Sequence, residues 1–416
     1  MNAGPTGIRP SQLILFFTSC LFSFTGGHMV NYSVIIYAQE VLGSDVLSGL
    51  GFALCFGPPV VLGWYAGVLC DRLAPTRIIH VGQFSLLASA VVLALGHWLV
   101  EESAWRIASV LGAALMAGVG WSFVAPARMT ALAQIVTPQK LPRAALVLNL
   151  LVMTGFGLGP MAISVLRIAG GWPTVFLVMA TLFALSSLCL LAVPSMASHK
   201  PHRPVLDEVF EGLRAVRTSP LLSQLLLAAI FGYLMMGPMQ VMLPKFARQV
   251  LVLPEFARGA FLGALAPALI VGGVLAMLVA RRLPNGPAIF AATLFAGLCF
   301  GAIGLMQSPS LATLFLVLAG TSGGMGISLI VASIQAQAQD SVRGRVLAMY
   351  TIISQVVPAA SGLVSGVLVY WMGAAQAIAV TGVAIATLAL VNAGWMHALR
   401  RYHGVAAAQS GHEPAP

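Results

Sequence analysis

Twelve long apolar stretches, separated by short polar turns, occupy most of this 416-residue sequence. A helix needs about 20 apolar residues to cross the hydrocarbon core of a bilayer, and each stretch reaches that length. Only 8% of the residues are charged and 59% are hydrophobic. A water-soluble protein of this size would need many more charged residues on its surface, so this class is excluded. Non-helical backbone facing lipid would lack hydrogen-bond partners, so the pattern predicts an all-α polytopic membrane protein with twelve transmembrane helices.

The expected limits of the twelve spans are 12–37, 46–70, 77–99, 106–127, 143–167, 173–194, 220–243, 257–280, 287–306, 311–336, 344–370 and 374–397. Gly and Pro clusters support this division, for example Gly170-Gly171 before the sixth span and residues 284–287 before the ninth. The first stretch lacks a clear small-residue cleavage site and is longer than a signal-peptide core. It is therefore expected to be retained as a span.

Basic residues are distributed unevenly over the predicted loops. If the termini and every second loop share one side, that side has sixteen Lys and Arg residues, Arg128 among them. The other side has five, which are Arg106, Arg167, Lys245, Arg248 and Arg258. This excess predicts that both termini are cytoplasmic. Charge confined to span ends, without a basic helix face, argues against a nucleic-acid partner despite the net charge of +10.

Short segments recur at an offset near 200 residues. Residues 37–42 resemble 246–251, and residues 143–146 resemble 345–348, at matching positions of the predicted spans. The repeat predicts two pseudo-symmetric six-helix bundles around a central cavity. The expected domains are an N-terminal bundle at 1–194, a central cytoplasmic loop at 195–219, a C-terminal bundle at 220–400 and a cytoplasmic tail at 401–416.

The loop between the second and third spans carries the most specific motif. Residues 67–77 resemble the signature loop of the major facilitator superfamily, Gly-x-x-x-Asp-Arg-x-Gly-Arg-Arg, with Ala74 and Pro75 as departures. The resemblance implies a breakable cytoplasmic latch between conformations. Its residues would be Gly67, Asp71, Arg72 and Arg77. The alternative is an ordinary capped helix end with flanking basic residues.

The fifth span contains Gly155, Gly159 and Pro160, which resemble the Gly-x-x-x-Gly-Pro signature of exporters in that superfamily. The resemblance implies a gating kink; the alternative is a packing kink without directional meaning. Residues 126–128, 141–144 and 211–221 resemble the branch of enterobactin- and alcaligin-type siderophore exporters and macrolide efflux pumps. This implies a proton-driven antiporter that exports a siderophore by alternating access, in the inner membrane of a bacterium.

Other functions remain alternatives. A multidrug or macrolide efflux pump fits the same resemblance, whereas a metal-ion exporter is disfavoured because the five cysteines are scattered through the apolar stretches. A non-transporting membrane sensor lacks an obvious output domain, and an enzyme is not expected because no catalytic motif is recognised. The expected partners are a small-molecule substrate, membrane lipid and protons, with no cofactor and no metal, and the chain is expected to be monomeric.

All eleven acidic residues lie at span ends or in loops, so no carboxylate is expected at the middle of the membrane. The proton-coupling candidates are His28, within the first span, and Glu40 at its end. His28 shares a helical face with Asn31 and Tyr32, which predicts either a ligand site or an interhelical hydrogen-bond seam. The substrate-cavity candidates are His28, Asn31, Tyr32, Asn149, Tyr233, Gln240, Gln335, Tyr350 and Ser354. The basic residues Arg128, Lys245 and Arg248 are expected to favour anionic groups.

Overall fold

The computed structural model describes residues 9–194, 213–214, 216–339 and 342–404, except for the side chains of residues 64, 67, 68 and 71. Within these residues the chain is helical and contains no strand. Ten helical segments are long and apolar enough to cross a membrane. Two of these segments each contain two spans, so the described residues form twelve spans, and the predicted all-α polytopic fold is confirmed.

The two double segments are α6 (Leu141–Leu191) and α14 (Arg343–Trp395), with 51 and 53 residues. At 1.5 Å per residue, a straight helix of that length would be about twice as long as a bilayer is thick. The backbone leaves helical dihedrals at Gly170 and Gly171 in α6 and at Gly373 in α14. Gly171 has a φ of 71° and Gly373 a φ of 77°, values that glycine adopts without steric cost, so each pair of spans turns at a glycine.

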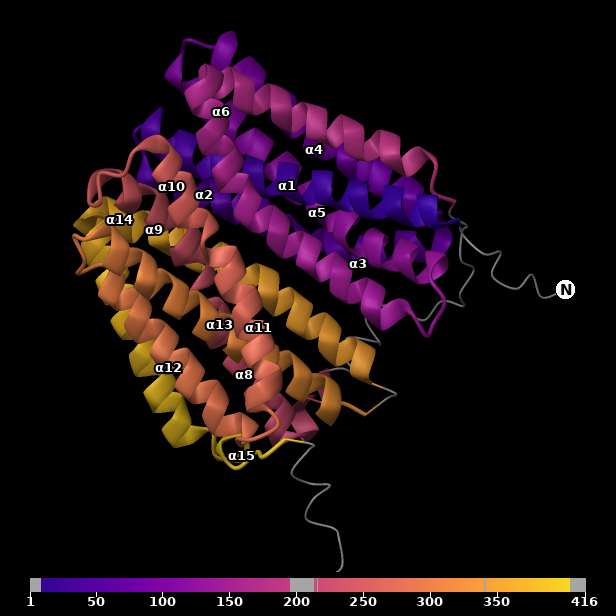
Figure 1. Cartoon of the computed structure of the whole chain (residues 1–416), viewed down its shortest axis with the longest axis vertical. Helices are drawn as coiled ribbons and strands as arrows, with labels where there is room; N and C mark the ends of the chain where they lie inside the picture. Colours follow the sequence, from indigo (N-terminus) through magenta and orange to yellow (C-terminus); the bar gives the residue numbers. More distant parts are fainter. Residues whose placement is uncertain (1–8, 195–212, 215, 340–341, 405–416) are drawn as a thin grey trace, which may run out of the picture. The chain divides into compact units, whose positions relative to one another are not determined.

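The remaining spans follow in chain order. The first four are α1 (Pro10–Glu40), α2 (Asp45–Phe56) with α3 (Pro58–Arg72), α4 (Pro75–Trp98) and α5 (Ser103–Ile135). After α6 come α8 (Pro220–Tyr233) with α9 (Met236–Gln249), α10 (Glu255–Gly263) with α11 (Leu265–Val279), α12 (Asn285–Ile303) and α13 (Pro309–Gln337), then α14 and the short α15 (His397–Arg400). Figure 1 shows these helices coloured along the sequence.

Three spans that were expected to be continuous are interrupted. In the second span Gly57 keeps helical dihedrals, but Pro58 and Pro59 have no N–H with which to bond the carbonyls one turn earlier. The carbonyl oxygen of Leu54 instead faces Gly118 of α5, where a side chain would collide with it. The seventh span is interrupted between α8 and α9, and the eighth at Ala264, between α10 and α11.

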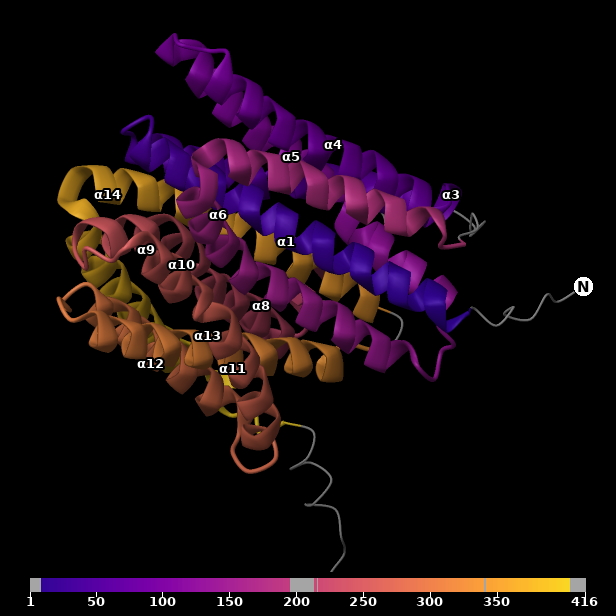
Figure 2. The same cartoon turned by 45° about the horizontal axis from the view of Figure 1, so that its top comes forward.

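Close contacts divide the chain into two compact units. Unit 1 comprises Met1–His202 and Leu253–Gly263, and unit 2 comprises Arg203–Val252 and Ala264–Pro416. Helix α10 therefore belongs to unit 1, where it packs against α6 (Figure 2). The chain enters this segment at Val252, whose φ of 50° is rare for a β-branched residue, and leaves it at the interruption at Ala264.

Within unit 1, α1 packs along α6, and α4 runs beside α5 (Figure 2). Its core contains buried side chains from several of these spans, among them Phe16, Ile79, Leu132 and Leu190. Within unit 2, α12 packs against α13 and α14, and α11 packs against α13. The core of unit 2 is built in the same way from apolar side chains of α8, α12, α13 and α14. The predicted loop at 195–219 and the tail at 401–416 lie mostly outside the described residues.

The structure corrects one step of the charge count. The fourth span was expected to end at residue 127, with Arg128 in a cytoplasmic loop. Helix α5 continues to Ile135, and Arg128 is fully buried inside it, with 0% of its surface exposed. The uneven distribution of the other basic residues is unaffected, because Arg128 was one of sixteen.

Candidate functional site

Helix α1 presents a row of rings to its neighbours in unit 1. Phe24, His28 and Tyr32 are four residues apart and so share one helical face. Phe24 stacks on Trp121 of α5, with ring centroids 5.7 Å apart, and the His28 ring lies 6.3 Å from the same Trp121. Phe156 of α6 lies edge-on to His28 at 5.1 Å and 6.0 Å from the Tyr32 ring. These five residues form what we call the aromatic column.

Two glycines allow α6 to approach the aromatic column. A Cβ atom on Gly155 would lie 2.7 Å from the backbone of Phe24, and one on Gly159 would lie 3.0 Å from the Cβ atom of His28. Any larger residue would therefore push the two helices apart. The helix remains helical through Pro160 and breaks only at Gly170 and Gly171. The Pro160 carbonyl faces Gly259 of α10, so this part of α6 is packed closely on two sides.

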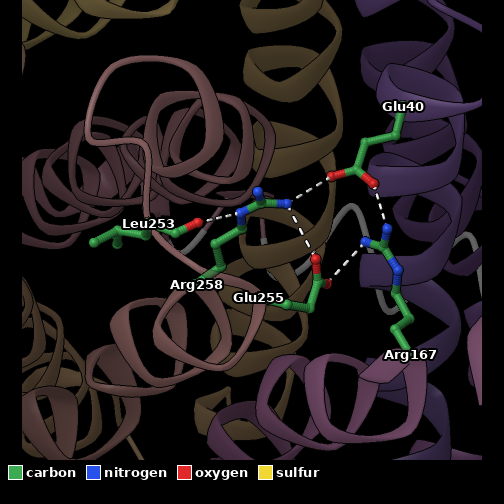
Figure 3. A network of polar contacts seen from close by, with 5 residues as sticks. All are labelled: Glu40, Arg167, Leu253, Glu255 and Arg258. Atoms are coloured by element: carbon green, nitrogen blue, oxygen red, sulfur yellow. Dashed lines mark hydrogen bonds and ion pairs between the residues drawn. The ribbon is translucent and has the colours of Figure 1, made fainter. Parts of the chain in front are cut away.

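A cluster of four charged side chains lies at the end of α1, where α6 and α10 meet it (Figure 3). We call Glu40, Arg167, Glu255 and Arg258 the charge cluster. Arg167 contacts Glu40 at 2.7 Å and Glu255 at 3.0 Å, while Arg258 contacts Glu255 at 3.1 Å and Glu40 at 3.5 Å. Each arginine thus shares both carboxylates, and the formal charges of the cluster sum to zero.

Further contacts hold the two arginines in place. Arg258 donates a hydrogen bond from Nε to the carbonyl oxygen of Leu253 at 2.7 Å, and the Arg167 guanidinium lies 4.6 Å over the Trp172 ring. Between 13% and 25% of each charged side chain is exposed, so the cluster is shielded but still accessible to water. The sequence analysis identified Glu40 but missed its partners. Arg167 and Arg258 were, however, already conspicuous as two of the few basic residues on the predicted outer side.

Unit 2 holds a second polar group. The hydroxyls of Tyr233 and Tyr350 are 2.7 Å apart and share a hydrogen bond, with ring centroids separated by 5.8 Å. Ser354, one turn beyond Tyr350, donates to the carbonyl oxygen of Thr351 at 2.7 Å. Gln240 is fully buried in α9, whereas Gln335 is exposed on α13. The structure therefore brings two of the predicted cavity residues, Tyr233 and Tyr350, into direct contact in this unit.

The other predicted positions differ in their burial. In unit 1, Asn31 is buried in α1, whereas Asn149 is exposed on α6. Arg72 and Arg77 of the predicted latch are exposed at the end of α3 and the start of α4. The Asp71 side chain and the surroundings of Gly67 lie outside the described part of the structure, so the latch stays a prediction.

A guanidinium is buried at the base of the aromatic column. Arg128 Nη1 donates to Cys20 Sγ at 2.8 Å, and Nη2 donates to the Ser19 carbonyl oxygen at 3.2 Å. Nη2 also lies 3.3 Å from the hydroxyl oxygens of Ser19 and Ser186. The Phe24 ring covers the group, with its centroid 5.5 Å from the guanidinium carbon. Three spans therefore meet at this one cation.

Comparison with known proteins identifies the fold. A family model described as Major Facilitator Superfamily matches residues 15–362. A crystal structure of a POT family transporter in complex with 5-aminolevulinic acid is similar, with a TM-score of 0.75 at 11% identity over 94% of this chain and 96% of that one. A bacterial homolog of the human lysosomal transporter Spinster, inward-facing and unoccupied, has a TM-score of 0.70 at 16% identity over 95% and 98% of the two chains. Among curated proteins no sequence matches significantly.

Proposed function

The chain belongs to the major facilitator superfamily, whose members are secondary transporters, and we propose that this member exports a small organic molecule, a siderophore, from a bacterial cytoplasm. The proposal places the chain in the inner membrane with both termini cytoplasmic, and it takes the proton gradient as the driving force. Alternating access between the two sides of the membrane would move the substrate.

The contact between α6 and α1 carries this proposal. Gly155 and Gly159, the exporter-type glycines, lie directly against the backbone and Cβ atoms that position Phe24 and His28. Movement of α6 at this contact would therefore shift the face of α1 that carries the substrate-cavity candidates. The part of α6 that suggests export therefore contacts the residues of α1 that are proposed to bind the substrate.

The available side chains suit a planar, oxygen-rich molecule. In the aromatic column the partly exposed rings of His28 and Trp121 offer faces for stacking, whereas Phe24, Tyr32 and Phe156 are buried behind them, and the Tyr233–Tyr350 pair offers hydroxyls for hydrogen bonds. A carboxylate is missing from both groups, although one is commonly used to bind an organic cation. Catecholate and hydroxamate siderophores combine planar groups with acidic oxygens, and so they match these side chains better than cationic drugs do.

We assign proton coupling to Glu40 rather than to His28. A proton on Glu40 would remove one of the two negative charges that hold Arg167 and Arg258, and so would loosen the joint between α1, α6 and α10. Uptake or loss of one proton at this carboxylate therefore changes how firmly three helices are held together. The ring contacts of His28 in the described part of the chain are aromatic, which favours a role in stacking.

Transport into inside-out membrane vesicles tests the proposal. Metal-free catecholate and hydroxamate siderophores should accumulate in vesicles whose interior is acidic, and a protonophore should abolish the accumulation. Glu40→Gln should uncouple uptake from the pH gradient, while Glu101→Gln, which alters an exposed loop carboxylate, serves as the matched control. Accumulation of a macrolide without either siderophore would instead support the efflux-pump alternative. If none of the three compounds is taken up, export is refuted.

A further inference from the structure

Among the side chains that the structure describes, no acidic group balances the buried positive charge of Arg128. The residue is fully buried, and its Nε atom has no hydrogen-bond partner in that part of the chain. The other nitrogens bond to a thiol, two hydroxyls and a carbonyl oxygen. Throughout the residues whose side chains are described, no carboxylate forms an ion pair with Arg128, and the acids of the charge cluster pair with Arg167 and Arg258 instead.

Burial of a charge without an opposite charge nearby is unfavourable in free energy, so we expect the charge to serve a function. A buried ion normally requires an opposite charge, because dipoles of hydroxyl and carbonyl groups offset only part of the lost hydration. Ionisable groups within membrane spans tend for this reason to mark functional positions. The hydrogen bonds of Arg128 fix the guanidinium in place but leave its net charge intact.

The field of this charge acts on the aromatic column. Phe24 lies directly over the guanidinium, and His28 follows one helical turn farther along α1. The distance from Arg128 to a ligand beside His28 is therefore about 10 Å. At an effective dielectric constant of about 20, a unit charge at that separation changes binding about tenfold.

We propose that Arg128 sets the charge selectivity of the transporter, favouring organic anions at the aromatic column and disfavouring organic cations. This inference rests on the proposed transport function and names its substrate class more narrowly. The cation does not have to touch the substrate, since its charge acts through Phe24. A single residue thereby separates acidic siderophores from the cationic compounds that the efflux-pump alternative would require.

A purely architectural role makes a different prediction. Arg128 links α1 and the second span of α6 through Ser19 and Ser186, and Gln83 of α4 also bonds to Ser186. If holding these helices were its sole role, replacing it would weaken binding of every substrate alike. The ratio of anion to cation affinity therefore distinguishes the two roles, and that ratio is independent of how much of a variant is correctly folded.

The test measures equilibrium binding to purified protein by quenching of tryptophan fluorescence. The probes are 2,3-dihydroxybenzoate as the anion and ethidium as the cation. Arg128→Met should lower the ratio of anion to cation affinity about a hundredfold, tenfold from each probe. Arg128→Lys should retain the ratio, and so should Arg106→Met, which removes a positive charge from the first turn of the same helix.

A second variant keeps the test decisive if Arg128→Met does not fold. Ser19→Asp places a carboxylate where the Ser19 hydroxyl now lies, 3.3 Å from Nη2, and so neutralises the cation without removing it. It should shift the ratio in the same direction as Arg128→Met. An unchanged ratio in both variants, or a wild-type protein that binds neither probe, overturns the inference. If the ratio shifts but vesicles do not export siderophores, charge selectivity stands and the proposed export fails.

Discussion

Glu40→Gln is the most informative perturbation of the charge cluster. The amide keeps the size of the side chain and its ability to accept a hydrogen bond, but removes the charge that faces Arg167 at 2.7 Å and Arg258 at 3.5 Å. Both arginines keep Glu255 as a partner, so the loss is that of two partly shielded ion pairs. Exposed pairs contribute up to about 1 kcal/mol each, and we therefore expect a loss of about 1–2 kcal/mol.

Thermal unfolding of the purified protein in detergent measures this loss. A destabilisation of that size should lower the melting temperature of a chain of this length by about 1–2 °C. A double-mutant cycle with Arg167→Gln should give a coupling free energy of about 1 kcal/mol, and 1 M salt, with a Debye length of about 3 Å, should reduce it. The exposed Glu101→Gln provides the control. Equal shifts for Glu40→Gln and Glu101→Gln, or strictly additive effects in the cycle, would refute the reasoning.

Three further variants test other contacts. Gly159→Leu should impair export at normal protein levels and lower stability by about 1–3 kcal/mol, because the new side chain meets the His28 backbone; vesicle uptake and thermal unfolding report on this. Tyr233→Phe and Tyr350→Phe should each cost about 1 kcal/mol, and the double variant little more, since both lose the same hydrogen bond; additive melting shifts would show that the bond is not shared. His28→Ala should weaken substrate binding while leaving the pH dependence of vesicle uptake intact, and loss of that dependence would return His28 to the coupling role.

Hydropathy and turn residues were sufficient to predict the number of spans. Each break between paired spans occurs at a glycine, Gly170-Gly171 in α6 and Gly373 in α14, and the expected limits fell next to both. The interruptions inside spans were harder to predict, because Pro58 and Ala264 lie within uniformly apolar sequence. A count of apolar residues does not register a missing N–H donor or a local turn.

Only part of the candidate site could be predicted from the sequence. Glu40 was found because it ends a span, and the face shared by His28 and Tyr32 follows from helical periodicity alone. The partners Arg167 and Arg258 are distant in sequence and meet Glu40 only through packing of α6 and α10, which periodicity does not encode. Arg128 was misplaced for a related reason, since a single arginine after Pro126 has the appearance of a span end although the helix continues beyond it.

The division of the eighth span has a consequence for synthesis of the chain. Residues 253–263 complete unit 1, yet the ribosome makes them only after the seventh span. Until α10 emerges, Glu40 and Arg167 lack Glu255 and Arg258, and the Pro160 carbonyl has no glycine packed against it. Domains generally fold as units during translation, in order from the N-terminus. Here unit 1 is incomplete until α10 has been synthesised, so its folding is coupled to membrane insertion of a later helix.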